Sequence, residues 1–234
     1  MLMRWFIFGL IIVSGGCVAT TPELQGDSRG LSKPSQAAIA SADPRATAAG
    51  MAVLERGGNA FDAAVAVAST LAVVEPAGSG LGGGGFFHLY VADSDEYRFI
   101  DAREVAPGAA HRDMYLDDNG QPIPKASVNG PLAAGIPGEP AGLAYLAENF
   151  GTLPLATLLE PAIEHAEQGF PIGRRALLGL RFRTKTILKS PAMKKVFLRN
   201  GEVPEEGTLI VQPDLAETLR RLGEQGADGF YQGE

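Results

Sequence analysis

Residues 78–107 read GSGLGGGGFFHLYVADSDEYRFIDAREVAP and contain the clearest fold signal in the chain. A glycine loop opens this stretch and is followed by an apolar run at 86–92 that is rich in aromatic residues. The polar turn at 93–96 separates this run from a second short run at 97–100. Two such runs joined by a turn cluster are typical of a β-hairpin. We therefore predict two paired strands with glycines at one end.

The glycine loop at 78–83 matches the pattern G-x-G-x-x-G of dinucleotide-binding proteins. That function requires a strand before the loop and a helix after it, so that phosphate meets the helix N-terminus. Here the order is reversed, because a helical pattern precedes the loop and strand-like residues follow it. We therefore interpret the loop as a structural turn, or as a backbone surface beside a ligand.

Arg103 lies at the other end of the predicted hairpin, between Asp101 and Glu104. One interpretation is an arginine that forms an ion pair and fixes the loop. The other is recognition of a ligand carboxylate, because the planar guanidinium can donate two parallel hydrogen bonds to it. The residues alone leave both interpretations open. His88 and His165 are interpreted as packed residues and not as catalytic bases.

Helices are predicted on both sides of the hairpin. Asp43-Pro44 is a helix start, and Asn59 with Asp62 three residues later forms a variant of the capping box. The helix that follows, 60–74, is apolar almost all round and is predicted to be buried. Further helices are expected at 140–150, 154–168 and from 213 to the glycine at 226, with loops at 107–137. The helices at 140–150 and 154–168 suggest an αα-hairpin.

The composition indicates a folded chain of one large domain or two small ones, since 45% of its 234 residues are hydrophobic. A net charge of −7 argues against nucleic acid as a main partner. Cys17 is the only cysteine, so no intrachain disulfide can form, and the three histidines lack metal-ligand spacing. We expect neither a metal ion nor a cofactor.

The N-terminus is predicted to be a targeting segment. One positive charge and the apolar stretch 5–13 precede Ser14, two glycines and Cys17, which resembles a lipoprotein signal peptide over residues 1–17. Lipidation of Cys17 would anchor the protein to a membrane, although Ser14 departs from the usual Leu. The alternative is a plain secretion signal. Residues 18–36 are polar and predicted to be a flexible tether, and the folded domain is expected at 37–234.

The segment from Gly173 to Gly201 is strongly basic. It contains nine of the chain's 20 Lys and Arg residues and no Asp or Glu. Contact with anionic lipid headgroups or with an acidic partner would explain the pattern. A solvated helical face would explain it without any partner, and we favour that interpretation.

Four ordered stretches make the sequence resemble the N-terminal part of the gamma-glutamyltranspeptidases, also called glutathione hydrolases. They are RGGNAFDAA at 56–64, VEPAGSGLGGGGF at 74–86, DAREVAP at 101–107, and GIPG at 135–138 with Tyr145 through Leu153-Pro154. The likeness runs from about Ala37 to the last residue. The resemblance implies an α/β (α+β) fold, part of an N-terminal-nucleophile (Ntn) hydrolase αββα sandwich. Two predicted strands are too few to cover the apolar helices, so we expect an incomplete part of that sandwich.

The resemblance also implies a function. Family members are proenzymes that cut themselves into a large and a small subunit, and the new N-terminal threonine attacks the gamma-glutamyl amide. The implied partners are glutathione and other gamma-glutamyl compounds, water or amino-acid and peptide acceptors, and the small subunit. Arg103 matches the family arginine that binds the α-carboxylate of the donor. The implied location is the periplasm, with membrane anchoring through Cys17.

One departure limits this expectation. The family's nucleophile lies in a Thr-Thr-His-type segment, whereas the only Thr-Thr here is Thr20-Thr21, followed by Pro22. No catalytic residue is therefore expected within this chain, and the chain alone is expected to be inactive. Two alternatives stay open: an amidase similar to cephalosporin acylase, with Arg103 holding a different carboxylate, and a non-catalytic, lipid-anchored binding module.

Overall fold

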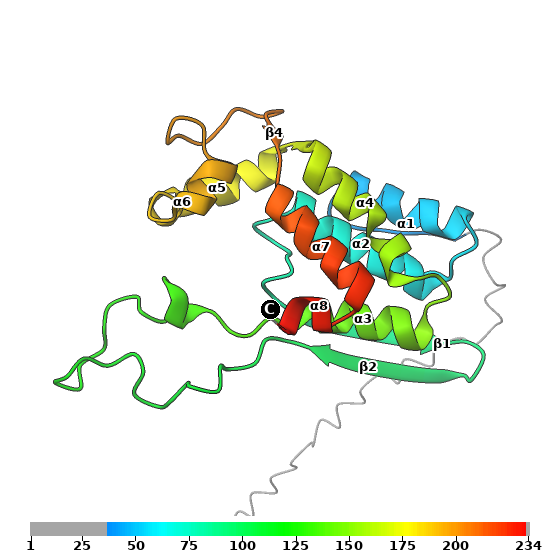
Figure 1. Ribbon diagram of the computed structural model, residues 1–234, viewed down its shortest axis with the longest axis horizontal. Helices are drawn as coiled ribbons and strands as arrows, with labels where there is room; N and C mark the ends of the chain where they lie inside the picture. Colours follow the sequence, from blue (N-terminus) through cyan, green and yellow to red (C-terminus); the bar gives the residue numbers. More distant parts are fainter. Residues whose placement is uncertain (1–36, 233–234) are drawn as a thin grey trace, which may run out of the picture. The chain divides into compact units, whose positions relative to one another are not determined.

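The computed structural model describes residues 37–232 (Figure 1). The expectations for the segment 1–17, for Cys17 and for the segment 18–36 lie outside the described residues. Among the residues that are described, no helix is long and apolar enough to cross a membrane.

Two capped helices open the fold as predicted. Helix α1 (Pro44–Glu55) begins at Asp43, whose side chain accepts a hydrogen bond from the backbone amide of Arg45. Helix α2 (Ala60–Val74) begins at Asn59, and both hydrogen bonds of the capping box are present. Helix α2 packs against α1 and against two later helices, and most of its residues are buried. The predicted core helix is confirmed.

Four more helices complete the helical layer. They are α3 (Glu139–Phe150), α4 (Leu155–Gln168), α7 (Pro213–Gln225) and the short α8 (Asp228–Tyr231). Helix α4 lies between α2 and α7 and has little contact with α3. The predicted αα-hairpin is therefore wrong, because the buried face of α4, which includes Leu158, Leu159 and Ala162, packs on these other helices.

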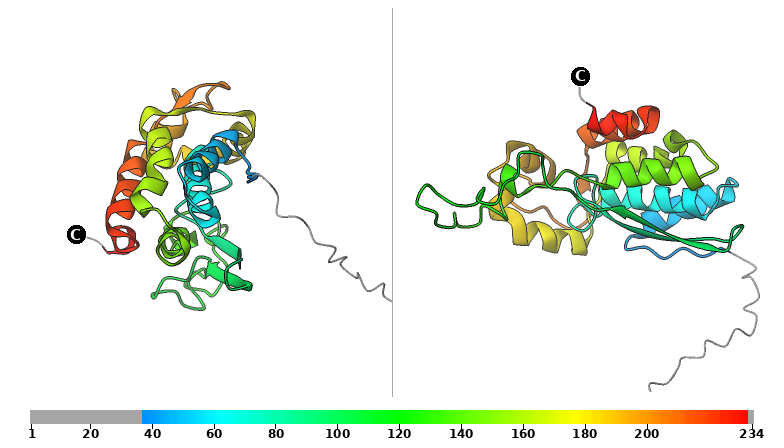
Figure 2. Two further views of the ribbon diagram at one scale, coloured as in Figure 1. Left: turned by 90° about the vertical axis from the view of Figure 1, so that its right-hand side faces the viewer. Right: turned by 90° about the horizontal axis from the view of Figure 1, so that it is seen from below.

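The predicted hairpin is confirmed. Strands β1 (Gly85–Val91) and β2 (Glu96–Ala102) pair antiparallel, with Gly85 opposite Ala102 and Val91 opposite Glu96. The helices lie on one face of this hairpin (Figures 1 and 2), where Leu89 and Ala102 are buried. A second small sheet pairs β3 (Phe170–Pro171) with β4 (Leu209–Ile210). The mixed α/β class is as predicted.

The opposite face of the hairpin is aromatic and exposed. Phe86, Tyr97 and Phe99 expose 56%, 72% and 63% of their surface. The rings of Phe86 and Phe99 lie 5.3 Å apart, and His88 stacks on Tyr97 at 5.7 Å. His88 is therefore not packed in the core as predicted. The alternation of a strand puts it on this open face.

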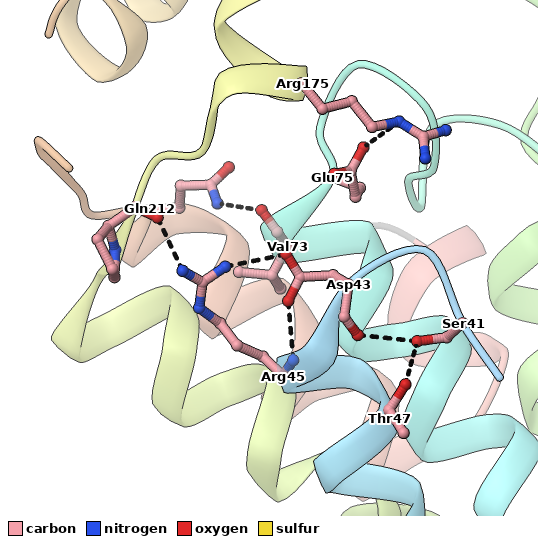
Figure 3. Close-up of polar contacts among 9 residues, drawn as sticks. Ser41, Asp43, Arg45, Thr47, Val73, Glu75, Arg175 and Gln212 are labelled. Atoms are coloured by element: carbon pink, nitrogen blue, oxygen red, sulfur yellow. Dashed lines mark hydrogen bonds and ion pairs between the residues drawn. The ribbon is translucent and has the colours of Figure 1, made fainter. Parts of the chain in front are cut away.

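A polar network ties the start of α1 to the rest of the helical layer (Figure 3). The guanidinium of Arg45 pairs with Asp43 at 2.9 Å and donates to the carbonyl oxygen of Pro171 at 2.9 Å. The side-chain amide of Gln212 donates to the carbonyl oxygen of Val73 at 3.0 Å. The Arg45–Pro171 and Gln212–Val73 hydrogen bonds join segments more than 100 residues apart in sequence, and they hold the helices around α2.

The basic segment forms helices α5 (Arg174–Ile187) and α6 (Pro191–Phe197). Eight of its nine Lys and Arg residues are exposed, as a solvated face requires. Between the hairpin and α3, residues 103–138 are mostly loop, with a short 3-10 helix at Pro131–Ala133.

Candidate functional site

The candidate site is built where three backbone segments meet at the end of β2. The backbone amides of Gly138 and Glu139, at the start of α3, both donate to the carbonyl oxygen of Gly83, at 2.9 and 3.1 Å. The amide and carbonyl groups of Val105 and Ile136 exchange hydrogen bonds of 3.1 and 2.8 Å. The glycine loop, the segment after β2 and the start of α3 are thereby joined.

Glycines make this close approach possible. A Cβ atom at Gly84 or at Gly138 would overlap the carbonyl oxygen of Ala102, and one at Gly142 would lie 2.6 Å from the Cβ of Ala102. Such contacts are shorter than side chains tolerate, so only glycine fits at these positions. The glycine loop follows a helix and precedes a strand, which is the order that argued against nucleotide binding.

Arg103 is the first residue after β2. Its backbone amide donates to the Asp101 carboxylate at 3.0 Å, and its Nε donates to the Glu104 carboxylate at 2.9 Å. The guanidinium carbon lies 5.7 Å from the ring centre of Phe86. The side chain is 57% exposed, and its two terminal nitrogens have no hydrogen-bond partner among residues 37–232. Arg103 is therefore both fixed by an ion pair and free to bind a carboxylate.

Two carboxylates near Arg103 have shifted pKa values. The pKa of Glu104 lies below its ordinary value, because the carboxylate accepts hydrogen bonds from its own backbone amide and from Arg103. The pKa of Glu139 lies above its ordinary value, because of burial first and the negative charge of Glu104 second. Glu104 thus stays ionised as the partner of Arg103, and Glu139 takes up a proton more readily.

Two open pockets flank this segment. One, of about 480 Å³, is lined by the glycine loop, Glu104 and Glu139. The other, of about 620 Å³, is mostly apolar and includes Arg103, Ile136, Tyr145 and Tyr231 in its lining. Arg103 thus belongs to the lining of the second pocket, and its partner Glu104 belongs to the lining of the first.

Tyr231 is a site residue that the sequence did not reveal. It belongs to α8, and its hydroxyl donates to the carbonyl oxygen of Pro137 at 2.6 Å and accepts from the amide of Ala141 at 3.2 Å. Burial raises the pKa of Tyr231, so the hydroxyl keeps its proton and the bond to Pro137. No local pattern marks a contact that spans 94 residues. Glu139 was also missed, although it directly follows the GIPG stretch.

No group of three or more His, Cys, Asp or Glu side chains that could hold a metal ion occurs among the described residues.

The family model described as Gamma-glutamyltranspeptidase matches residues 46–234. The chain is 43% identical over 197 residues to a glutathione hydrolase proenzyme of Pseudomonas sp. (strain A14), covering 84% of this chain and 34% of the relative. It is similar to the crystal structure of Helicobacter pylori gamma-glutamyltranspeptidase, with a TM-score of 0.80 and 44% identity over 83% of this chain and 56% of that one. A cephalosporin acylase from Bacillus halodurans gives a TM-score of 0.69 at 29% identity, over 82% of this chain and 36% of that one.

Proposed function

Since this chain belongs to the gamma-glutamyltranspeptidase family, we propose that it is the large-subunit part of a glutathione hydrolase or gamma-glutamyltransferase. The chain spans about a third of the length of the curated relatives it matches (34% and 33%). The active enzyme is therefore proposed to need the part of the protein that corresponds to the rest of those relatives. That part would supply the threonine nucleophile.

The position of Arg103 carries this proposal. Its guanidinium is fixed at Nε by Glu104, its side chain is 57% exposed, and Arg103 is one of the residues that line the apolar pocket. A carboxylate accepts two parallel hydrogen bonds from such a group, which gives both affinity and orientation. We assign to Arg103 the α-carboxylate of the gamma-glutamyl donor, because Arg103 matches the family arginine with that role. The gamma-carbonyl, at the opposite end of the glutamyl group, would then lie away from the arginine.

The proposed chemistry follows from a threonine whose own amine acts as base. The threonine hydroxyl attacks the gamma-carbonyl carbon, an ester bond forms, and the amide C–N bond breaks as the leaving amine takes the proton. Water or the amine of an acceptor then attacks the ester and restores the hydroxyl. Arg103 takes no part in bond breaking and holds the glutamyl group during both steps.

The exposed face of the hairpin is proposed to receive the small subunit. Its aromatic side chains (Phe86, Tyr90, Tyr97 and Phe99) form an apolar surface larger than single exposed residues would make. Such surfaces mark interaction sites. A second sheet packed on this face would complete the two β-layers of an αββα sandwich, and would bring the residues of the partner close to Arg103.

A second function has a specific observation in its favour. The similarity to the cephalosporin acylase covers nearly as much of this chain as that to the transpeptidase, at lower identity. The same arginine would then hold the side-chain carboxylate of a glutaryl cephalosporin. Hydrolysis of glutathione and of a glutaryl cephalosporin by the full-length protein separates the two functions. We expect glutathione to be cleaved with the higher kcat/KM, and a preference for the cephalosporin would overturn the first proposal.

We also propose that the protein is a lipoprotein anchored on the periplasmic side of a membrane. This rests on the sequence of residues 1–17, with Cys17 after two glycines. Cells that express the protein would be grown with a radioactive fatty acid, with Cys17→Ser as the control. Label in the wild-type protein alone is the expected result, and its absence from the wild-type protein would leave a plain secretion signal.

A further inference from the structure

Helix α5 presents a combination of basic and apolar side chains on its exposed side. A helix turns 100° per residue, so six exposed residues lie along one stripe: Arg174, Arg175, Leu178, Arg181, Phe182 and Lys185. The opposite side of α5 is buried in the core through Ala176, Leu177, Leu180 and Ile187. We call the six exposed residues the α5 stripe.

The apolar members of the α5 stripe are unusual for a solvated face. Phe182 exposes 86% of its surface, more than any other large apolar side chain that is exposed among residues 37–232. Leu178, one helical turn earlier, exposes 57%. A solvated helix requires charged residues, but it gains nothing from a phenylalanine and a leucine in water. A purely solvated face would therefore account for the charged residues of the α5 stripe, but it would not account for the exposure of Phe182 and Leu178.

The charges of the α5 stripe are available to a partner. Arg174, Arg181 and Lys185 form no ion pair with any of the described residues, and Arg175 pairs with Glu75 at 3.5 Å. No acidic residue occurs between 173 and 201, whereas the chain as a whole carries a net charge of −7. The positive charge is therefore local, and it surrounds the two exposed apolar side chains.

Helix α5 also contacts the body of the domain on its buried side. A Cβ atom at Gly179 would lie 2.6 Å from the Cβ of Ala77, so the helix packs closely on the start of the glycine loop. The side chain of Arg183 reaches Asn129 at 3.3 Å. Because these contacts lie on the buried side of the helix, its stripe faces solvent.

We propose that the α5 stripe docks on a membrane surface that carries anionic lipid headgroups. Leu178 and Phe182 would enter the interfacial layer, and Arg174, Arg181 and Lys185 would lie among the headgroup phosphates. Interfacial helices also combine Lys and Arg with exposed aromatic and aliphatic residues, and in α5 both kinds lie on the exposed side, because the other side is buried in the core. An acidic protein surface would also satisfy the charges and the exposed phenylalanine, and a stripe that binds no anionic vesicle in the test below would favour it. This inference does not depend on the proposed enzymatic function.

The test places a tryptophan in the α5 stripe and uses the complete 234-residue chain. Trp5 is the only native tryptophan, so Phe182→Trp in a Trp5→Phe background gives a fluorescence signal from the stripe alone. Glu148→Trp in the same background is the control, since residue 148 is exposed on helix α3 and belongs to neither proposed binding surface. Each protein is mixed with vesicles of pure phosphatidylcholine, and with vesicles that also contain phosphatidylglycerol.

With phosphatidylglycerol, we expect the emission of the Phe182→Trp protein to shift to the blue and its quenching by acrylamide to fall. The Glu148→Trp protein should change in neither respect. Replacing both Arg181 and Lys185 by Gln should weaken binding at low salt roughly 30-fold, about fivefold for each charge. Equal shifts on both vesicles, or none, would overturn the proposal. A blue shift in buffer that grows with protein concentration would overturn it too, by showing that a second copy covers the stripe.

Discussion

The Nε of Arg103 donates a hydrogen bond of 2.9 Å to the carboxylate of the next residue, Glu104. This contact uses one edge of the guanidinium, while the ring centre of Phe86 lies 5.7 Å from the guanidinium carbon. Both neighbours restrict the orientations of the side chain and leave the terminal nitrogens unpaired among the described residues. A loop clamp and a ligand-binding group are not exclusive functions of this arginine, because the first prepares the second.

Replacing Glu104 by Gln should weaken substrate binding without removing it. The variant loses the charge of the carboxylate that orients Arg103, so we expect KM for gamma-glutamyl donors to rise roughly three- to tenfold, the range typical of one lost hydrogen bond. We expect kcat to change little. Steady-state kinetics of the full-length protein measure both. An unchanged KM would show that Glu104 does not orient the arginine.

The same substitution should lower the pKa of Glu139. That pKa is raised by burial and, to a lesser degree, by the negative charge of Glu104. Removing the second cause by Glu104→Gln leaves the first, so the pKa of Glu139 should fall but stay above its ordinary value. Carbon-13 NMR titration of the Glu139 carboxyl measures the shift. A pKa that rises in the variant would contradict the described geometry.

A methyl group at Gly138 should destabilise the domain. Its φ is −106°, which any residue can adopt, so Gly138→Ala tests crowding against the Ala102 carbonyl and not backbone strain. We expect the free energy of unfolding to fall by about 1 to 3 kcal/mol, as is typical of overpacking. Gly82→Ala is the control, because nothing lies within 4 Å of the added atom. Equal effects of both substitutions in denaturant unfolding would refute the close approach.

Asp62 should make stability depend on pH in acid. It is fully buried and accepts hydrogen bonds from Asn59, Thr152 and Leu153. Burial would raise its pKa, but these hydrogen bonds outweigh burial and lower it. Its contribution is therefore present above the unfolded pKa of about 3.9 and is lost as pH falls through the folded value.

Asp62→Asn should lower the free energy of unfolding at neutral pH by about 2 to 3 kcal/mol, because the new amide group faces donors. Its stability should also fall less steeply in acid than that of the wild-type protein. Asp118→Asn, in an exposed loop, should change neither quantity. Denaturant unfolding at several pH values tests this, and parallel pH curves for Asp62→Asn and the wild-type protein would contradict it.

The parts of the fold that could be predicted are those with local signals. The caps at Asp43 and Asn59 and the hairpin turn depend on neighbouring residues, and each prediction lies within one or two residues of the structure. Arg103 stands out in the sequence through its position between two carboxylates. The spacing of apolar residues in the sequence also shows which predicted helices have an apolar face.

Contacts between distant segments could not be predicted. The sequence places Asp62 in a helix cap, but its hydrogen bonds to Thr152 cross 90 residues. Helix α4 has an apolar face that fits several partners, and only the three-dimensional structure shows that it packs on α2 and α7. Tyr231 reaches the site for the same reason, since α8 is placed by its packing on α7.

Binding of the substrate carboxylate by Arg103 is the central feature of the proposed function, and one measurement tests it most directly. The measurement is KM for a gamma-glutamyl anilide with full-length protein carrying Arg103→Ala, compared with Arg98→Ala, an exposed arginine on β2 that pairs with Glu96. We expect KM to rise about 30-fold or more in the first variant, as loss of a charge-assisted hydrogen-bond pair of about 2 to 3 kcal/mol implies. Arg98→Ala should leave KM unchanged, and both variants should keep the wild-type unfolding midpoint. An unchanged KM in a folded Arg103→Ala protein would show that the arginine only fixes the loop.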